Sequence, residues 1–587
     1  MKHILMRFAG TGIYLHNGMN SKKKYLTECL LIAAAGLISS LPLIFAGIDG
    51  TVYQDLLFHL SRIEGIKEGV LSGQFPVMME SVWMEGKGYP VSIFYGDILL
   101  YIPALLRIVG VPVVITYKIF VLLINLLTAF SACFCFKRIF KYDISAYLGM
   151  FLYVLASYRL MDIFVRAAVG EYAAFIFFPV IALGVKKILF DDAGSRDYYK
   201  NSLILTLGMT GLIETHVLST VMTVFLLALT LILFAKATFR KKTLLCILKA
   251  VGESIIVNLY FFVPFIDYYI NEPVYAGKGG DHTQALQIRS SGAYIRQFFD
   301  FFGHIFGRNV EDINMRMQLT VGLSLTLALF ACLVLFLIKY RNYKIFVLGA
   351  MSFLCLLMST DLFPWNSLEG YTHLFKILSK VQFPWRYLAA SITFIALLTG
   401  ALADRVLDDH EKISETLVRI ASFVLVIVSV ITTAVFSVRY KADYFMVDFK
   451  TYDEVDSGYM GACEYLKEGT ELTVTEYVPE NPQLEAYELR SVKDSKVTVY
   501  VANPGDASFV EIPKLNYKGY RAFDEDKNPL SIENGYLNLI NVVVPKGYEG
   551  NITVKFVQPL SWRISQLISL AGIILIIVYI RKRKPGV

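Results

Sequence analysis

Apolar runs long enough to cross a lipid bilayer recur along this chain, and they limit what it can fold into. We count about twelve runs of roughly 15 to 23 residues, the length that a membrane-spanning helix needs. The runs are 25–46, 113–136, 144–157, 172–189, 203–213, 217–235, 244–266, 319–338, 345–359, 388–403, 420–437 and 561–579, of which 203–213 is short. Only 18% of the 587 residues are charged and mean hydropathy is +0.53, whereas soluble proteins have about a quarter charged. The sequence predicts a polytopic α-helical membrane protein and excludes soluble, disordered and disulfide-rich classes.

The positions of the basic clusters predict the orientation. The apolar stretch 98–109 is too short to span and is interrupted by Pro103 and Arg107, so we interpret it as an interfacial helix. With that choice the basic clusters share one side: 22–24, 137–138, 186–187, 240–242, 339–341 and 581–584. The positive-inside rule makes that side cytoplasmic. Both termini are then expected in the cytoplasm, and 1–24, which lacks a cleavage pattern, is expected to be a cytoplasmic tail.

The chain divides into a membrane domain and an external β domain. We assign 25–438 to the membrane domain, with a large first outer loop at 47–111, and 560–587 to a final span with a basic tail. In 439–559 the residues around Val497, Val499 and Val501 alternate at period two, and Asn534-Gly535 is a hairpin-turn signal. We expect an extracytoplasmic β-sandwich, either a rigid lid or a glycan-binding module. The seven cysteines predict neither a disulfide framework nor a metal site.

Candidate catalytic residues lie in the first outer loop. On a helix, Asp55, His59 and Arg62 stand at i, i+4 and i+7 and share one polar face, opposite Leu60 and Ile63. An acid, an imidazole and a guanidinium in this arrangement could deprotonate a hydroxyl and hold a phosphate. The alternative is an ordinary interfacial amphipathic helix with a solvated face.

A second outer connection, 158–171, carries Asp162, Arg166 and Glu171 between two spans. A carboxylate held near lipid is costly and needs a partner or a function, and Arg166 is close enough in sequence to pair with it. The sequence leaves open whether this is a structural salt bridge or part of a site.

Two further outer positions carry polar side chains. His216 lies in the turn Glu214-Thr215-His216, and Arg386 stands beside Trp385 at the start of the tenth span. An arginine there could bind a phosphodiester head group, or it could anchor the chain in the interfacial aromatic belt. No glycine-rich phosphate loop, Ser/His/Asp order, zinc spacing or Walker pattern is found.

The order of these motifs resembles the bacterial YfhO-type membrane proteins and the relatives labelled "pyruvoyl-tetrahydropterin synthase-related". The motifs are Asp55-x-x-Phe58-His59-x-x-Arg62, Gly73-Gln74-Phe75-Pro76, Gly88-Tyr89-Pro90, Phe94-Tyr95, Tyr158-Arg159-Leu160, Arg166-x-x-x-Gly170-Glu171, Thr215-His216, Gln382-Phe383-Pro384-Trp385-Arg386 and Pro513-x-x-x-Tyr517-x-Gly519-Tyr520. The resemblance covers nearly the whole chain. The pterin label does not transfer, because a pterin synthase needs zinc held by clustered histidines and the eight histidines are scattered.

The resemblance implies the GT-C glycosyltransferase architecture, with a polyprenyl-phosphate sugar as donor and a site in the first outer loop. It makes Asp55 the acid that acts near the acceptor, and Glu171 or Asp162 the second acidic position. His59 would orient the base, or bind a divalent cation such as Mg²⁺ or Mn²⁺ together with the acids; whether a metal is needed is left open.

The remaining implied site residues would bind substrate. Arg62, Arg166 and Arg386 are candidates for the donor phosphate, and Tyr95 and His216 are further substrate contacts. The acceptor would be an envelope polymer or glycolipid outside the bacterial plasma membrane, and a partner glycosyltransferase would charge the lipid carrier. No nucleic acid is expected as a partner.

Two other functions remain open from the sequence. A transporter or flippase for lipid-linked glycans would carry charges deep within its spans, for which Lys249 and Glu253 are the main candidates. A scaffold for polysaccharide assembly would bind polymer through the β domain, and the outer charges would then be structural.

Overall fold

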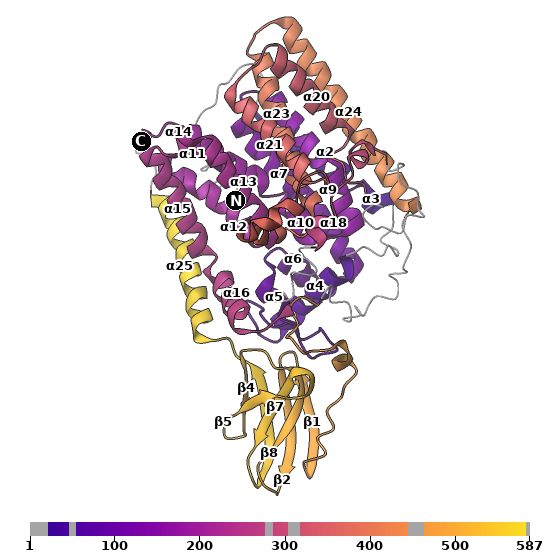
Figure 1. Ribbon diagram of the computed structural model, residues 1–587, viewed down its shortest axis with the longest axis vertical. Coiled ribbons are helices and arrows are strands. Elements are labelled where there is room, and N and C mark those ends of the chain that lie inside the picture. Colours follow the sequence, from indigo (N-terminus) through magenta and orange to yellow (C-terminus); the bar gives the residue numbers. More distant parts are fainter. Residues whose placement is uncertain (1–20, 46–54, 276–285, 303–316, 444–462, 583–587) are drawn as a thin grey trace.

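The computed structural model describes residues 21–45, 55–275, 286–302, 317–443 and 463–582. A helical body carries a β domain at one end, and the last helix returns along the side of the body (Figure 1). The helices are α2 (Ser21–Ser39), α3 (Leu41–Phe45), α4 (Leu56–Leu71), α5 (Val91–Phe94), α6 (Tyr101–Ile108), α7 (Val113–Ile139), α8 (Asp143–Val154), α9 (Ser157–Met161), α10 (Val169–Ala174), α11 (Phe178–Phe190), α12 (Asn201–Ile213), α13 (Val217–Leu233), α14 (Ala235–Thr238), α15 (Lys241–Val257), α16 (Leu259–Asn271), α18 (Leu286–Ser290), α20 (Leu323–Ile338), α21 (Tyr343–Met358), α22 (Thr372–Ser379), α23 (Tyr387–Leu407), α24 (Lys412–Asp443) and α25 (Leu560–Lys582).

Every predicted apolar run coincides with one helix or with two adjoining helices, so the helical part of the prediction is confirmed. Within the described residues, the helices long and apolar enough to cross a membrane are Val113–Ile139, Val169–Phe190, Pro384–Leu407, Lys412–Arg439 and Leu560–Arg581. These are 5 helices, and the number of candidate spans becomes 7 if each of two bent helix pairs is one span. Shorter helices such as α12, with 13 residues, reach only about 20 Å. Twelve crossings, and their orientation, therefore stay a prediction.

Two of the predicted spans, 144–157 and 244–266, coincide with the bent helix pairs. α15 and α16 meet at Asn258 with a bend of 72°. The buried Asn258 side chain donates to the Thr210 hydroxyl (3.0 Å) and to the Ser254 carbonyl (2.6 Å). Pro264 lies inside α16 and cannot donate to the carbonyl four residues earlier, so the first part of α16 has one backbone hydrogen bond fewer. With this bend, α16 turns toward the β domain (Figure 1).

The second bent pair lies where we predicted an outer loop at 158–171. α8 is followed by α9 after a bend of 41°, and α9 continues into a π-helical turn, η1 (Asp162–Arg166). Residues 158–171 are all buried within the protein, and their position on the outer side of the membrane stays a prediction. Their charged side chains tolerate burial because they pair with one another, as described below.

The β domain is a two-sheet sandwich, as predicted. One sheet has the strand order β1-β2-β8-β4-β5 and the other β3-β7-β6, and the neighbouring strands within each sheet are antiparallel. The strands are β1 (Ala486–Lys493), β2 (Lys496–Asn503), β3 (Ser508–Leu515), β4 (Tyr520–Phe523), β5 (Pro529–Leu530), β6 (Ile532–Asn534), β7 (Leu539–Val544) and β8 (Tyr548–Phe556). Alternate residues of β2 point inward, and Val497, Val499 and Val501 are fully buried. β6 and β7 pair across the predicted turn at Gly535.

Specific contacts hold the β domain to the helical body. Asp267 at the end of α16 pairs with Lys518 (2.6 Å) and accepts a hydrogen bond from the Trp562 indole (2.8 Å). Tyr465, in the segment before the first strand, stacks on Phe94 with ring centroids 4.7 Å apart. The sandwich therefore rests directly on the first outer segment, beside the candidate site.

Candidate functional site

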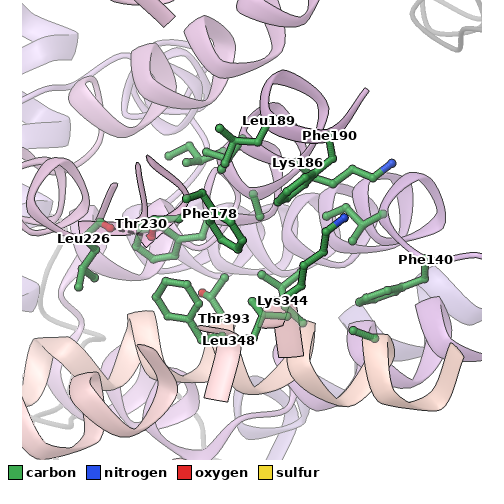
Figure 2. A pocket seen from close by; sticks show the side chains of 18 of the residues that line it. Phe140, Phe178, Lys186, Leu189, Phe190, Leu226, Thr230, Lys344, Leu348 and Thr393 are labelled. Carbon is green, nitrogen blue, oxygen red and sulfur yellow. Dashed lines mark hydrogen bonds between the residues drawn. The ribbon is translucent and has the colours of Figure 1, made fainter. Parts of the chain in front are cut away.

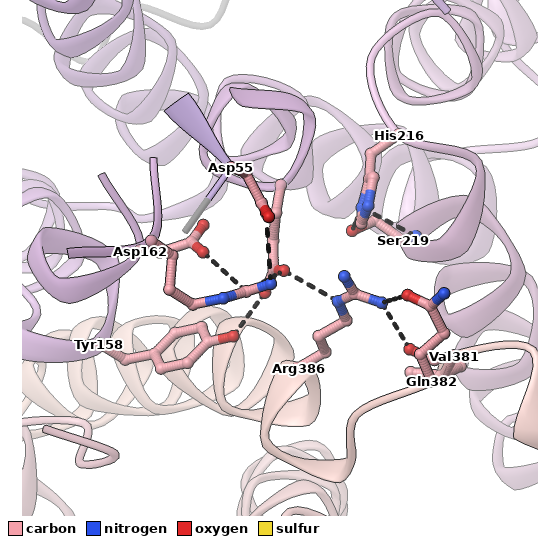
Figure 3. Close-up of polar contacts among 10 residues, drawn as sticks. Asp55, Tyr158, Asp162, His216, Ser219, Val381, Gln382 and Arg386 are labelled. Carbon is pink, nitrogen blue, oxygen red and sulfur yellow. Dashed lines mark hydrogen bonds and ion pairs between the residues drawn. The ribbon is translucent and has the colours of Figure 1, made fainter. Parts of the chain in front are cut away.

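Segments distant in sequence converge on one buried group of charges (Figure 3). The start of α4 brings Asp55, the turn η1 brings Asp162 and Arg166, α10 brings Glu171, and the short helix η6 (Pro384–Arg386) before α23 brings Arg386. The structure thus unites acids and arginines that the sequence placed in three separate outer connections.

Glu171 is the centre of the group and is 1% exposed. One carboxylate oxygen, Oε2, lies 2.8 Å from Arg166 Nη1 and 2.9 Å from Arg386 Nε. The other oxygen, Oε1, accepts a hydrogen bond from the hydroxyl of Tyr158. A carboxylate held by two guanidiniums and a phenol is ionised, because neutralising it would leave both cations without a counter-charge.

The π-helical turn positions Arg166. A π turn inserts an extra residue into a helix and rotates the side chains that follow, and such turns are frequent at functional sites. Here it ends at Ala167, which has a left-handed backbone (φ 52°), and the Arg166 side chain also contacts Asp162 (3.0 Å). The Arg166 carbonyl accepts the backbone N–H of Asp55 (2.9 Å), which joins η1 to the start of α4.

Asp55 is the carboxylate of this group that is open to solvent. Its side chain is 41% exposed, and one carboxylate oxygen lies 3.8 Å from Arg166 Nη2. It occupies the N-cap position of α4 without a side-chain capping hydrogen bond, so its oxygens are not committed to the helix. Partial withdrawal from water raises the pKa of Asp55, against the lowering effect of Arg166 and Arg386. A partly exposed carboxylate with a raised pKa is suited to accept a proton.

Arg386 is fixed by groups on its own segment. Its Nη1 donates to the carbonyl of Val381 (2.7 Å) and to the side chain of Gln382 (2.9 Å), and Gln382 has a left-handed backbone (φ 65°). Among the described residues, Nη2 has no hydrogen-bond partner. It points toward the side where His216 and Ser219 lie (Figure 3). The Nη2 edge of this guanidinium is therefore left for a ligand, while the centroid of the Phe383 ring lies 5.0 Å from its central carbon.

The two candidate histidines border the group as neutral side chains. Burial holds the pKa of His59 well below its usual value and, with the nearby Arg386 charge, lowers the pKa of His216 to about 3. The His216 Nδ1 is bonded to Ser219 (2.7 Å) at the start of α13. Tyr95 lies between them, with ring centroids 5.9 Å from each imidazole. Neutral imidazoles cannot stabilise a phosphate by charge.

Arg62 is committed to the first outer segment. Its Nη2 donates to the carbonyls of Tyr95 (3.1 Å) and Gly96 (3.0 Å), and its guanidinium lies 4.2 Å from the Tyr95 ring centroid. The side chain is fully buried. These contacts fix the position of Tyr95, whose hydroxyl approaches so closely that a Cβ at Gly170 would lie 2.3 Å from it.

Other buried acids lie on the far side of Arg62. Glu80 accepts hydrogen bonds from the Trp83 indole (2.7 Å) and from a serine hydroxyl, and burial raises its pKa to about 8. Burial also raises the pKa of Glu214 to about 8 and that of Asp97 to about 6. At neutral pH the two glutamates are therefore largely protonated, so they add little negative charge next to the candidate site.

Three residues of the site were missed by the sequence analysis. Tyr158 and Gln382 appeared only as motif letters, and their contacts with Glu171 and Arg386 come from the way the helices pack. Glu464, which enters from the β-domain side, interacts electrostatically with Asp55 and Arg386 and hydrogen-bonds Gln382. No local pattern could have found Glu464, because it lies about 400 residues from Asp55 in the sequence.

The sequence left open whether a divalent cation binds at this site. Nowhere in the described residues does a group of three or more His, Cys, Asp or Glu side chains come close enough to hold a metal ion. The acids of the site are instead arranged around the arginines Arg166 and Arg386.

Comparisons with known proteins give only distant similarities. No protein-family model and no curated protein matches the sequence, so membership of the YfhO-type family stays a prediction. Among solved structures, the apo oligosaccharyltransferase of Archaeoglobus fulgidus is 12% identical with a TM-score of 0.43, covering 73% of this chain and 57% of that one.

Two other structures of the enzyme from the same organism are similar to this chain. The form tethered with an acceptor peptide containing the NVT sequon is 12% identical with a TM-score of 0.42, covering 73% of this chain and 56% of that one. The complex of AglB with an inhibitory peptide and a dolichol-phosphate is 11% identical with a TM-score of 0.37, covering 71% and 56%. This chain spans little more than half the length of these neighbours, and similarities of this size assign no activity.

Proposed function

We propose that this chain is a membrane glycosyltransferase of the GT-C type. It would move a sugar from a polyprenyl-phosphate donor to a hydroxyl of a cell-envelope polymer or glycolipid, outside a bacterial plasma membrane. The observation that carries the proposal is the pairing of a solvent-accessible carboxylate, Asp55, with two arginines, Arg166 and Arg386, that are pre-positioned by the buried Glu171.

Asp55 is the proposed general base. The acceptor hydroxyl would give its proton to the Asp55 carboxylate while its oxygen forms a bond to the anomeric carbon of the sugar, and the bond from that carbon to the phosphate oxygen breaks. The raised pKa of Asp55 strengthens it as a base, and activity should rise as the pH rises through that pKa because only the ionised form accepts a proton.

Arg386, assisted by Arg166, is the proposed binding group for the departing lipid phosphate. The leaving phosphate gains a negative charge as the bond to the sugar breaks, so a fixed cation beside it stabilises the transition state more than the ground state. The free Nη2 of Arg386 supports this role, since a guanidinium has five donors and Glu171, Val381 and Gln382 engage only two of its three nitrogens.

Glu171 and Asp162 are then positioning residues, not groups that touch substrate. Both are essentially inaccessible to solvent, and they hold the Arg166 and Arg386 side chains in place. Tyr95, His59, Arg62 and His216 would lie beside the bound sugar and limit the shape that the site accepts. The β domain, which reaches the site through Glu464, would guide a polymer acceptor to Asp55.

A transfer assay with the purified full chain tests this proposal. The protein in lipid vesicles would be supplied with polyprenyl-phosphate sugars and acceptor extracted from the host envelope, and release of free polyprenyl phosphate would be followed by mass spectrometry. We expect Asp55→Asn to abolish release. Glu68→Gln is the matched control, because Glu68 lies on α4 with 44% exposure, close to the 41% of Asp55, and outside the site. Release that Asp55→Asn leaves unchanged would contradict the proposal.

The second candidate function, transport of a lipid-linked glycan, would depend on charges that lie within a predicted span. Lys249 and Glu253 form an ion pair within α15, and Glu253 also accepts a hydrogen bond from Thr206 of α12 (3.1 Å). The pair is internally compensated, as a structural ion pair is. If the chain is a transporter, Lys249→Met should abolish lipid translocation and Asp55→Asn should have no effect. If it is a transferase, Asp55→Asn should abolish activity and Lys249→Met should have no effect.

A further inference from the structure

A large apolar cavity opens within the helical body, between α11 and α13 on one side and α21 and α23 on the other (Figure 2). Its volume is about 450 Å³, within the range of pockets that enclose small organic ligands. The walls are mainly apolar and include Phe178, Ile181, Leu226, Leu348, Phe394 and Leu397. Empty space of this size between apolar helices is unfavourable unless hydrocarbon fills it.

Basic side chains surround one end of the cavity. Lys186, Lys344 and Arg405 line this end, and the amines of Lys186 and Lys344 lie near each other beside Phe190 (Figure 2). The charges of Lys186 and Arg405 both act on Lys344, so these cations repel one another.

The nearby acids compensate these three cations only in part. Asp408 is paired with Lys141, and Asp404 accepts backbone N–H groups of the loop before α8, at 2.7 and 3.2 Å. Asp191 forms ion pairs with both Lys187 (3.1 Å) and Lys186 (3.8 Å), so the two lysines share a single negative charge. Lys344 and Arg405 form no ion pair within the described part of the chain. Clustered cations at the mouth of a hydrocarbon-sized cavity are complementary to a lipid with an anionic head group.

This basic end lies far from the candidate active site. Arg386 and Arg405 are on one helical segment and are separated by 19 residues, so about 28 Å of helix lies between them. That distance is close to the thickness of a bilayer core, about 30 Å. A head group at Arg405 would belong to the leaflet opposite the one that faces Asp55, so the cavity's polar end is not the site of sugar transfer.

We propose that this cavity binds an anionic phospholipid from the leaflet opposite the active site. One acyl chain would lie between α11, α13, α21 and α23, and the phosphate would contact Lys186, Lys344 and Arg405. The positive-inside tendency explains basic residues at this membrane face in general, but it does not explain an apolar cavity that ends at three of them. The bound lipid would fill the space between the two helix pairs and hold them apart at a fixed distance.

Lipid binding to the purified full chain tests the proposal. Native mass spectrometry in detergent would compare dioleoyl-phosphatidylglycerol with dioleoyl-phosphatidylcholine, which has the same chains and no net charge. We expect the anionic lipid to bind at least about tenfold more tightly. The triple variant Lys186→Gln/Lys344→Gln/Arg405→Gln should lose this preference, because each basic residue near an anionic lipid contributes about a fivefold factor.

A matched control and a second variant make the result decisive. The control Lys236→Gln/Arg341→Gln/Lys412→Gln removes three exposed basic residues that do not line the cavity, and it should keep the preference. Ala182→Phe places a ring inside the cavity and leaves the cations intact. It should weaken the binding of phosphatidylglycerol by about tenfold, whereas Ala182→Ser should leave that binding unchanged. The proposal would be overturned if the two lipids bind equally, or if the control variant loses the preference as much as the cavity variant does. Full binding of phosphatidylglycerol by Ala182→Phe would also overturn it. Preferred retention of a polyprenyl phosphate over phosphatidylglycerol would overturn it too, in favour of a donor site.

Discussion

Removing the charge of Glu171 should destabilise the folded protein strongly, because this carboxylate is the shared partner of two buried cations. Glu171→Gln keeps the shape of the side chain but leaves Arg166 (3% exposed) and Arg386 (7% exposed) without their 2.8 and 2.9 Å ion pairs. Breaking a buried ion pair by removing one partner costs about 3–5 kcal/mol. Asp162 still contacts Arg166 (3.0 Å), so we expect about 3 kcal/mol, near the lower end.

The free energy of unfolding in mixed micelles, measured by titration with a denaturing detergent, gives this quantity. The double variant Glu171→Gln/Arg386→Gln removes one of the stranded cations, so it should be less destabilised than the sum of the two single variants by about 1–3 kcal/mol. Glu68→Gln, an exposed carboxylate on α4, should change stability by less than about 0.5 kcal/mol. If the effects of Glu171→Gln and Arg386→Gln simply add, or if Glu171→Gln is as mild as Glu68→Gln, the charge network described here does not hold the site together.

Three further changes have defined outcomes. Burial raises the pKa of Glu80 to about 8, so the folded state keeps a proton that the unfolded state releases above its ordinary pKa of 4.5. The free energy of unfolding therefore falls as the pH rises through about 8. Between pH 7 and 9 the wild type should lose about 1.4 kcal/mol of stability that Glu80→Gln does not lose. Gly170→Ala should lower stability by about 1–3 kcal/mol in the same titration, because the new Cβ would lie 2.5 Å from the rigid Thr215 carbonyl, and an unchanged midpoint would contradict this packing. Arg386→Ala should weaken use of the lipid donor more than use of the acceptor in initial-rate measurements, and equal effects on both would argue against a phosphate contact.

The sequence was sufficient to locate the helices and the β domain. Continuous apolar runs and the alternation at Val497, Val499 and Val501 depend only on local periodicity, and the structure places helices and a strand there. It was not sufficient to predict the bend of 72° at Asn258. That bend depends on a hydrogen bond from Asn258 to Thr210, on another helix, which hydropathy does not encode.

The candidate site was predictable in its residues but not in its arrangement. The sequence suggested an Arg166–Glu171 pair from their spacing, and the structure confirms it at 2.8 Å. It gave no indication that Arg386 shares the same carboxylate, or that Glu464 reaches the site from the β-domain side, because these contacts join segments hundreds of residues apart. The expected polar face of α4 is also different: Arg62 and His59 are buried, and Asp55 alone of the three is partly exposed to solvent.

The central claim is that Asp55 takes part in sugar transfer, and one comparison of strains tests it most directly. Three strains would be compared: one that lacks the gene, one that carries the wild type, and one that carries Asp55→Asn at equal membrane abundance. Mass spectrometry would measure the polyprenyl-phosphate sugars and the decoration of the envelope polymer in each strain. We predict that one sugar disappears from a polymer while its lipid carrier accumulates, in the deletion and in Asp55→Asn alike. Unchanged decoration in both strains, or full restoration by Asp55→Asn, would contradict the claim.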